Sequence, residues 1–329
     1  MKEKDFFRSL VGQSDCFLRA VGRIPTVARS NTVVLLSGES GTGKELFARA
    51  IHYESFRQNK PFIPVNCGAV PDHLFENELF GHIRGAFTDA AFEQKGLVAE
   101  AEGGTLFLDE IDALNLSGQV KLLRFLQDGE YRPLGSPKNR FADVRTIAAT
   151  NTDLKLRVET KLFREDLYYR LNIVSLYLPP LRERLGDIPI LAAHFLSRYG
   201  CQYDRGSLCL SSGAIQKLLA YSWPGNIREL EAVLHQAVLL APSLTIQPHD
   251  IAISSPCLNA ESAEASLRGA KNRIIEEFER GYLISLLARH EGNISRASKA
   301  AGKDRRSFQR LLRKYGLQLP PSRNVVRSG

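Results

Sequence analysis

The stretch G-E-S-G-T-G-K-E, residues 38–45, decides the fold of this chain. It follows the apolar run T-V-V-L-L (32–36) and precedes the helix-like run L-F-A-R-A-I (46–51). A strand, a glycine loop and a helix in this order predict a phosphate-binding loop, because glycines let backbone N–H groups converge on one anion and the helix adds its positive amino-terminal end. Lys44 is expected to reach the outer phosphates. The residues predicted to hold a nucleoside triphosphate are Gly38, Glu39, Ser40, Gly41, Thr42, Gly43, Lys44 and Glu45.

A second segment, G-T-L-F-L-D-E at 104–110, is an apolar strand that ends in two acids, at the edge where parallel sheets bind ligands. Glu45 stands where the general loop motif has a Ser or Thr that binds Mg²⁺, so the metal must be held mainly by phosphates and by carboxylates elsewhere. We expect Asp109 to hold the Mg²⁺ shell and Glu110 to orient and polarise the attacking water.

A third apolar strand, T-I-A-A-T-N at 146–151, also ends in polar side chains. Thr150 and Asn151 are therefore predicted to sense the γ-phosphate, although either residue alone equally fits an ordinary strand-end turn. Asp109 follows Lys44 by 65 positions. The three segments together predict an ATPase that uses ATP and Mg²⁺.

The composition is that of a folded protein with a large core. The chain has 329 residues, of which 43% are hydrophobic and 24% charged, enough for two or three folding units. No apolar run approaches the roughly 20 residues of a membrane span, and residues 1–5 lack the apolar core of a signal peptide. We therefore expect a cytoplasmic protein without a membrane partner. The five cysteines form no C-x-x-C pair and are expected to be reduced and buried, neither a disulfide framework nor a zinc site.

The periodicity of the apolar residues divides the chain. From Val33 to about Leu178 apolar strands alternate with helical stretches, which predicts an α/β domain with a parallel sheet. From about Asp187 to Ile251 only helical periodicity remains, which predicts a small helical lid. A stretch rich in Ser, Ala, Pro and Glu then indicates a linker. The predicted boundaries are 1–182 for the α/β subdomain, 183–253 for the lid, 254–270 for the linker, 271–318 for a terminal helical domain and 319–329 for a tail.

The net charge of +8 is concentrated at the carboxyl end. Residues 266–329 carry 15 basic and 5 acidic side chains, whereas the rest of the chain carries 29 and 31. This imbalance indicates a module that binds a polyanion.

In this basic region, helices at 294–301 and 305–315 flank the turn Gly302-Lys303-Asp304, which predicts a helix-turn-helix with Asp304 as N-cap. A solvated basic helix is the alternative. The predicted DNA-binding residues are Arg305, Arg306, Gln309, Arg310 and Arg313.

These features together resemble the bacterial enhancer-binding proteins, the AAA+ activators of sigma-54 RNA polymerase, over nearly the whole chain. Residues 38–45 match that family's form of the phosphate-binding loop (P-loop), Glu45 included. G-G-T-L-F-L-D-E at 103–110 resembles its second nucleotide motif, L-F-R-E-D-L-Y-Y-R-L at 162–171 its arginine-finger region, and W-P-G-N-I-R-E-L at 223–230 its lid motif. The carboxyl-terminal unit resembles a Fis-type helix-turn-helix.

The resemblance implies roles for further residues. Arg164 and Arg170 are expected to reach the neighbouring subunit's ATP and stabilise charge on its γ-phosphate, whereas spacing alone fits surface ion pairs with nearby acids. Arg228 is expected to contact the phosphates and report the nucleotide state to the lid, or else to be a helix-surface arginine. Asn66 is expected to restrain Glu110, or else to satisfy its own strand-end turn.

The segment G-A-F-T-D-A at 85–90 resembles the G-A-F-T-G-A loop that contacts sigma-54, a loop implied to be particular to this family. Phe87 is expected to be an exposed aromatic anchor and Thr88 a polar contact, and the alternative is an aromatic packed beneath a surface turn. Asp89 replaces the second glycine, which adds a negative charge and removes backbone freedom. The predicted contact residues are Gly85, Ala86, Phe87, Thr88, Asp89 and Ala90.

The resemblance implies an ATP-dependent transcription activator that binds upstream, enhancer-like DNA and remodels the closed sigma-54 RNA polymerase complex. Self-association into a ring, expected to be a hexamer, is implied as well. The family match begins near Leu10, so no sensor domain is expected ahead of it. Control is then expected from a regulatory protein acting in trans or from the protein's own abundance, as in phage-shock-type members. On DNA the protein would be associated with the nucleoid.

Two other functions stay open at this point. Asp89 supports a DNA-binding AAA+ regulator that no longer activates sigma-54 and acts as a repressor or as a partner in a mixed ring. An AAA+ motor that processes DNA, such as a branch-migration motor, is the third possibility. It leaves the loop at 85–90 without a role.

Overall fold

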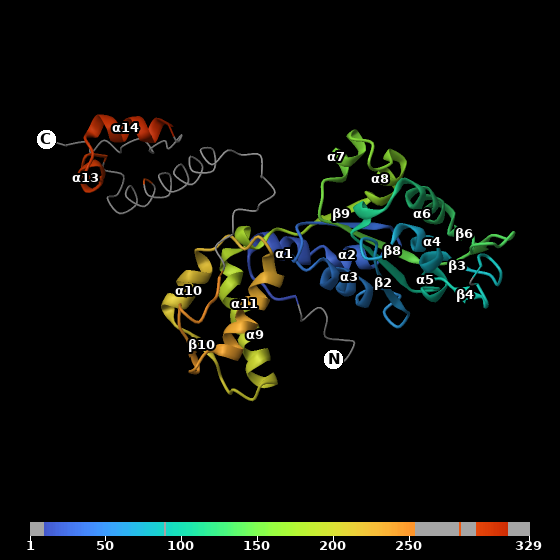
Figure 1. Cartoon of the computed structure of the whole chain (residues 1–329), viewed down its shortest axis with the longest axis horizontal. Helices are drawn as coiled ribbons and strands as arrows, with labels where there is room; N and C mark the ends of the chain where they lie inside the picture. The colour runs from blue at the N-terminus through green and yellow to red at the C-terminus, as the bar shows by residue number, and fades with distance from the viewer. Residues whose placement is uncertain (1–9, 89, 254–282, 284–293, 315–329) are drawn as a thin grey trace. The chain divides into compact units, whose positions relative to one another are not determined.

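The protein divides into two units, residues 1–253 and residues 254–329. The structure is a computed structural model that describes residues 10–88, 90–253, 283 and 294–314 (Figure 1). None of the helices in these described ranges is long and apolar enough to cross a membrane.

A five-stranded parallel sheet forms the centre of the larger unit, and its strand order is β2-β5-β8-β1-β9. In register, Asn66 lies opposite Asp109 and Ser37 lies opposite Thr150. The carboxyl ends of the central strands therefore meet at one edge, as parallel sheets with ligand sites require. The strands are β1 (Val34–Ser37), β2 (Phe62–Asn66), β5 (Thr105–Asp109), β8 (Arg145–Thr150) and β9 (Val174–Tyr177).

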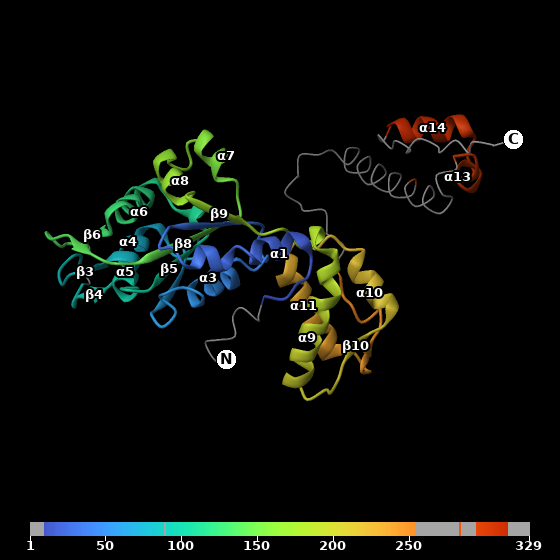
Figure 2. The ribbon, with the colours of Figure 1, turned by 180° about the vertical axis from the view of Figure 1, so that it is seen from behind.

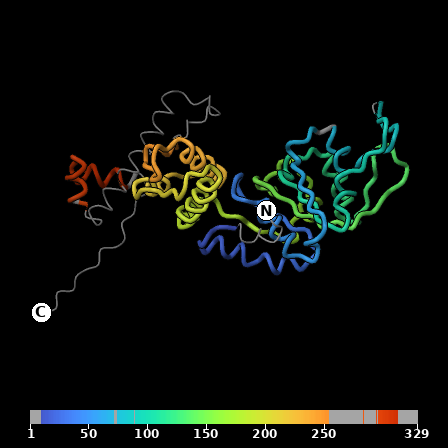
Figure 3. Tube along the Cα trace, turned by 90° about the horizontal axis from the view of Figure 1, so that it is seen from below, coloured from blue at the N-terminus to red at the C-terminus, as the bar shows by residue number. Residues whose placement is uncertain are grey.

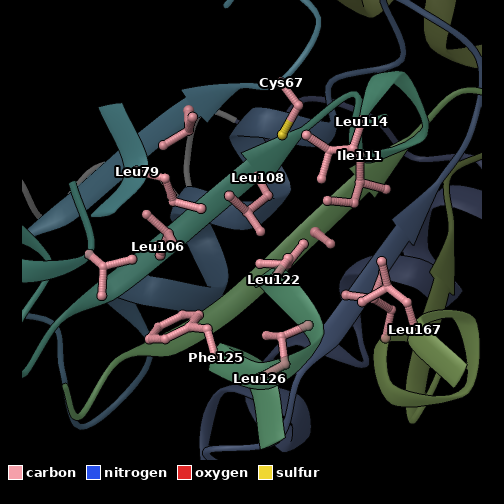
Figure 4. Close-up of a cluster of buried hydrophobic side chains, with 14 of the residues drawn as sticks. Cys67, Leu79, Leu106, Leu108, Ile111, Leu114, Leu122, Phe125, Leu126 and Leu167 are labelled. Atoms are coloured by element: carbon pink, nitrogen blue, oxygen red, sulfur yellow. The ribbon is translucent and has the colours of Figure 1, made fainter. Parts of the chain in front are cut away.

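Helices cover both faces of this sheet (Figures 1 and 2). Leu106 and Leu108 point into a core with the helices α4, α6 and α8 (Figure 4). Phe107 points into a second core with α1, α2 and α3. Burial on both faces explains why the strands read as continuous apolar runs, and the predicted α/β class is confirmed. The helices are α1 (Asp15–Val21), α2 (Ile24–Ala28), α3 (Lys44–Tyr53), α4 (Asp72–Phe80), α5 (Leu97–Glu100), α6 (Leu116–Asp128), α7 (Leu154–Glu159) and α8 (Glu165–Leu171).

Two short antiparallel hairpins project together from one end of this unit (Figure 3). The first pairs β3 (Gly81–His82) with β4 (Gln94–Lys95), and the second pairs β6 (Glu130–Tyr131) with β7 (Arg140–Phe141). A bridge between His82 and Leu134 joins them. The sequence did not predict these hairpins, because strands of two residues leave no readable alternation.

The predicted helical lid is confirmed. Its helices α9 (Ile188–Gln202), α10 (Ser212–Leu219) and α11 (Asn226–Leu240) enclose a third core. Trp223 is fully buried there, and its indole Nε1 donates to the carbonyl of Leu218 at 2.9 Å.

Two details of the lid were not predicted. It contains a parallel strand pair, β10 (Cys209–Leu210) with β11 (Thr245–Ile246). The expectation that the cysteines are buried was wrong for Cys201 and Cys209, which are exposed, and it holds for Cys67. Cys201 lies near the end of α9 and Cys209 in the two-residue strand β10, and both positions are at the lid surface.

The described part of the second unit contains α13 (Ile294–Ala300) and α14 (Arg305–Lys314). Gly302 has a positive φ of 62° in the turn, and the Asp304 carboxylate accepts the Ser307 N–H at 2.8 Å at the start of α14. Four side chains form a small core: Leu283, Ala297, Phe308 and Leu312. The predicted Fis-type helix-turn-helix fold is confirmed, whereas the linker 254–270, the first helix apart from Leu283 and the tail lie outside the described residues.

Candidate functional site

The glycine loop wraps around the amino terminus of α3. Gly43 precedes the helix with φ 98°, a left-handed conformation that glycine adopts without strain. Lys44 is largely buried, and its Nζ donates to the carbonyls of Gly38 at 2.8 Å and Glu39 at 3.0 Å. Burial lowers the pKa of Lys44, while the nearby Asp109 carboxylate opposes this shift. The ammonium group is thus held inside the loop, where an anion would pair with it.

Glu45 does not point into the loop. Its Oε1 accepts from Arg49 Nε at 2.9 Å and from Nη2 at 2.7 Å, one turn further along α3. Because this carboxylate is exposed and paired on the helix surface, it lies away from the position of a magnesium ligand. Asp109, at the end of β5, is a carboxylate that could hold Mg²⁺ beside phosphates.

The acids at the end of β5 lie beside the end of β2. Glu110 has a left-handed φ of 53°, which is uncommon for a residue with a side chain, and its N–H donates to Asp109 Oδ1 at 2.9 Å. A methyl group added to Gly68 would lie 2.5 Å from Glu110 Oε2, so the carboxylate packs directly on this glycine. Asn66 Oδ1 accepts the N–H groups of Gly68 at 2.8 Å and Ala69 at 3.0 Å. Asn66 thus satisfies its own strand-end turn, which is the alternative stated for it, and Glu110 packs on the same turn at Gly68.

Asp112 is a buried acid at this edge that the sequence analysis missed. The Thr150 hydroxyl donates to Asp112 Oδ1 at 2.8 Å, and Arg157 Nη1 donates to the Asp112 carbonyl at 2.8 Å. Since the Thr150 hydroxyl is buried and bonded to Asp112, the exposed Asn151 is the better placed of the two for a phosphate contact. The spacing D-E-I-D (109–112) was the available signal, because a 3-10 turn (Ile111–Ala113) returns Asp112 to the edge of the sheet.

The lid contacts the P-loop directly. Arg228 Nη1 donates to Ser40 Oγ at 3.0 Å, and Asn226 Nδ2 donates to the Ser40 carbonyl at 3.0 Å. Glu39, which the sequence assigned to the nucleotide, forms a two-bond ion pair with Arg182 at 2.6 and 2.7 Å. This hydrogen-bonded pairing holds the pKa of Glu39 below its usual value. The P-loop and the lid are therefore linked through hydrogen bonds at the adjacent residues Glu39 and Ser40.

Replacing Asn226 with alanine is expected to destabilise the contact between the lid and the P-loop. The side chain is fully buried, accepts the Leu181 N–H at 2.7 Å and sits at φ 53°, which asparagine tolerates better than alanine. Loss of the acceptor and added backbone strain should lower the free energy of unfolding by about 2–4 kcal/mol in urea denaturation. Arg228→Ala, which removes one exposed hydrogen bond, should change it by less than about 0.5 kcal/mol. Equal effects of the two substitutions would contradict this assignment.

A cleft of about 620 Å³ lies beside the P-loop, between α3 and the lid. Its lining is mostly apolar, as a nucleoside base prefers. The residues that line it include Val11, Phe17, Thr42, Leu46, Leu191 and Ile227. The buried Asp187 fixes one wall by accepting the N–H groups of Gln13 at 2.6 Å and Ser14 at 2.8 Å, together with Arg184 Nε at 2.8 Å. The sequence did not predict this wall, because Asp187 lies 174 positions from Gln13 and 173 from Ser14.

Arg164 and Arg170 do not join the P-loop of their own chain. Arg164 is half exposed and makes a two-bond ion pair with Asp166 at 2.6 and 3.0 Å. Arg170 donates to the carbonyls of Leu126 at 2.9 Å and Gln127 at 3.1 Å. It lines a hollow of about 690 Å³ at the amino-terminal ends of β1 and β8, opposite the edge that carries the P-loop.

The loop of the first hairpin presents Phe87. Its side chain is 44% exposed, and its ring packs at 4.9 Å from the ring of the buried His82. The Gly85 N–H donates to the Ala90 carbonyl at 2.9 Å and closes the loop. Phe87 is thus partly exposed and partly packed, which lies between the two expectations. Asp89 lies outside the described residues.

Helix α14 has one apolar and one basic face. Phe308 and Leu312 are buried against the other helix. Three arginines, Arg305, Arg306 and Arg310, are exposed on the remaining surface. Gln309 is partly exposed beside them. The side chain of Arg313 lies outside the described part of the chain. Among the described candidates, the structure brings the four together on one short helix.

Three family models match consecutive parts of the chain: the sigma-54 interaction domain at residues 10–177, the AAA+ ATPase lid domain at 182–266, and the bacterial regulatory protein, Fis family, at 274–315. The chain is 45% identical over 309 residues to the transcriptional regulatory protein GlrR of Escherichia coli, covering 94% of this chain and 68% of that protein. It is 48% identical over 262 residues to the sigma54-dependent transcriptional activator SfnR of Pseudomonas putida, covering 80% and 72%.

Solved structures agree with these matches. NtrX from Brucella abortus in complex with ATP superposes with a TM-score of 0.69 at 33% identity, covering 94% of this chain and 69% of that chain. The same protein in complex with ADP gives 0.69 at 32% identity, covering 95% and 71%. A RuvB mutant from Thermotoga maritima, at 14% identity and a TM-score of 0.51, covers 96% of this chain and 92% of that chain and shares the fold alone.

Proposed function

The chain belongs to the AAA+ family of sigma-54 transcription activators, and we propose that it hydrolyses ATP to remodel sigma-54 RNA polymerase from an upstream DNA site. The observation that carries this proposal is the edge of the sheet, where Lys44, Asp109 and a strained Glu110 meet in the unit that also presents the Phe87 loop. NtrX, a relative in fold and sequence, has been solved with ATP and with ADP, which supports nucleotide binding.

The proposed reaction is attack of water on the γ-phosphate of ATP. Lys44 and the loop N–H groups hold the phosphates, and Asn151 contacts the γ-phosphate. Mg²⁺, held by Asp109 and the phosphates, would neutralise the charge on those oxygens. Glu110 orients the water, and Asn66 restrains Glu110 through the turn at Gly68 that both side chains contact.

We propose that the arginines act on a neighbouring subunit in a ring, which we expect to be a hexamer. Support comes from their position, because Arg170 lies at the amino-terminal ends of β1 and β8, away from its own P-loop. A guanidinium from the next subunit would add positive charge at the γ-phosphate to that of Lys44. The lid would report the nucleotide state through Arg228, which already contacts Ser40.

We propose that the segment 85–90 contacts sigma-54, with Phe87 as its anchor and Thr88 as a polar neighbour. Residues 1–182 form the ATPase subdomain, 183–253 its lid and 271–318 the DNA-binding domain, and the protein acts in the cytoplasm on nucleoid DNA. A regulatory protein acting in trans is the proposed control. Asp89 favours one alternative, a DNA-binding repressor or mixed-ring partner without sigma-54 activation.

Replacing Arg306 with alanine is expected to weaken DNA binding by about tenfold. The guanidinium is exposed near the amino terminus of α14, where a recognition helix meets base edges, and one such contact contributes about 1–3 kcal/mol. The measurement is fluorescence anisotropy with a DNA fragment that the native chain selects from a random pool. Arg19→Ala, an exposed arginine on α1, is the control and should bind as the native chain does. Equal affinity of both variants would contradict the role of α14.

The proposed function is tested by open-complex formation with sigma-54 polymerase, ATP and a promoter that carries the selected upstream site. Opening of the promoter supports the activator. ATP hydrolysis and DNA binding without opening would favour the repressor or mixed-ring alternative instead.

A further inference from the structure

Gln119 is a fully buried glutamine in the first turn of α6, and its side-chain amide bonds to three backbone groups. Its Nε2 donates to the carbonyls of Leu114 at 2.8 Å and Leu162 at 3.1 Å. Its Oε1 accepts the N–H of Arg164 at 2.8 Å. A buried amide is tolerated only when its hydrogen bonds are made, so this one holds the three backbone groups in fixed positions.

These backbone groups belong to two segments with proposed roles in catalysis. Leu114 follows Glu110 by one 3-10 turn (Ile111–Ala113), so it ends the segment that begins at the acid proposed to orient water. Leu162 and Arg164 flank the buried Phe163 immediately before α8. One side chain therefore joins the segment of the chain's own ATP site to the segment that carries an arginine for the neighbour's site.

The helix α6 also holds the other end of α8. Arg170, in the last turn of α8, donates to the carbonyls of Leu126 and Gln127 near the end of α6. The start of α8 is held by Gln119, whose acceptor fixes the N–H of the N-cap residue Arg164. Both arginines are thus positioned along one helix, at points separated by about two turns.

A second link runs parallel to the Gln119 amide. Arg157 donates to the Asp112 carbonyl at 2.8 Å, and the Arg157 carbonyl accepts the N–H groups of Leu162 at 2.9 Å and Phe163 at 3.1 Å. Two side chains, Gln119 and Arg157, therefore connect the segment before Arg164 to the turn that follows Glu110. Rotation of that turn would break these hydrogen bonds unless the segment before Arg164 moved with it, and breaking a buried hydrogen bond costs free energy.

We propose that Gln119 is a positioning residue that sets Arg164 for the ATP site of the neighbouring subunit and couples that arginine to the state of Glu110 in its own subunit. This inference rests on the proposed ATPase ring. Gln119 is fully buried, so it acts on catalysis only through the segments it joins. A displacement of about 1 Å in a catalytic group costs up to about a hundredfold in rate.

The test begins with Gln119→Met, which keeps the length of the side chain and removes its three hydrogen bonds. ATP turnover is expected to fall about tenfold to a hundredfold, while ATP affinity and ring assembly stay as in the native chain. Gln216→Met, an exposed glutamine on α10, is the matched control and should hydrolyse ATP at the native rate. Native turnover in Gln119→Met would overturn the inference.

The deciding readout is a mixture of subunits. Glu110→Gln is expected to be inactive in its own site while presenting an intact Arg164, so adding it to Gln119→Met should raise turnover per Gln119→Met subunit several-fold. Arg164→Ala mixed with Glu110→Gln is the positive control and should show the same rescue. If Glu110→Gln rescued Arg164→Ala but not Gln119→Met, Gln119 would act on the ATP site of its own subunit, and the inference would be overturned.

Two further outcomes are separated by design. If Gln119→Met does not fold, Gln119→Leu is the second variant, because it is uncharged and also lacks all three hydrogen bonds, and the same rescue is expected from it. If the native chain does not hydrolyse ATP, the proposed function itself is wrong, whereas active native chain with unrescued variants contradicts only the role of Gln119.

Discussion

Glu110→Gln is expected to lower the ATP turnover number by about 10²–10⁴-fold, the range for loss of a positioned general base. Glutamine has nearly the same shape as glutamate, so the packing on Gly68 is retained while the charge that polarises water is lost. ATP affinity should stay within about twofold, because Lys44 and the loop N–H groups bind the phosphates. Steady-state turnover at saturating ATP and binding of a fluorescent ATP analogue measure the two effects separately.

The control for this prediction is Glu54→Gln, an exposed glutamate just after α3, which should leave turnover unchanged. The backbone at Glu110 supports a functional role for this residue. A left-handed φ of 53° at a non-glycine residue is retained only where the surroundings require it. A Glu110→Gln variant with native turnover would assign the activation of water to another residue and leave that strained conformation without a functional reason.

Phe87→Ala is expected to abolish open-complex formation while ATP hydrolysis continues. Truncation of a central aromatic anchor costs at least about 2 kcal/mol of binding, which is about thirtyfold in affinity for the partner. Phe87 is 44% exposed on the hairpin loop and packs on His82, whereas the P-loop lies at the end of β1. The loss should therefore be confined to contact with the polymerase. Promoter opening and ATP turnover are measured on the same preparation.

Phe56→Ala is the matched control, because Phe56 is an exposed phenylalanine in the connection from α3 to β2. It should open the promoter as the native chain does. Promoter opening by Phe87→Ala at the native rate would remove the hairpin loop from the sigma-54 contact. Parallel loss of ATP hydrolysis would instead show that the loop is needed for assembly of the active ring.

The features that the sequence predicted well are those encoded within a few residues. The P-loop joins β1 to α3 in one uninterrupted stretch, and Asp109 ends an apolar strand, so order along the chain already fixes their place in the sheet. The helix-turn-helix is likewise local, with Asp304 capping α14 over one turn. Such patterns need no knowledge of distant contacts.

The features that the sequence did not predict depend on distant segments. Glu39 was assigned to the nucleotide, yet its carboxylate pairs with Arg182, 143 positions away. Thr150 and Asn151 were equivalent in the sequence, and only the contact with Asp112 separates them. Gln119 looks like an ordinary helical glutamine until the fold brings Leu162 and Arg164 against it. The spacing of these residues along the chain does not predict which of them come into contact.

The most direct test of the central claim is open-complex formation on a sigma-54 promoter that carries the selected upstream site, with sigma-54 polymerase and ATP. We expect the native chain to open the promoter and neither Phe87→Ala nor Glu110→Gln to do so. A native chain that hydrolysed ATP and bound the DNA but left the promoter closed would contradict the activator function.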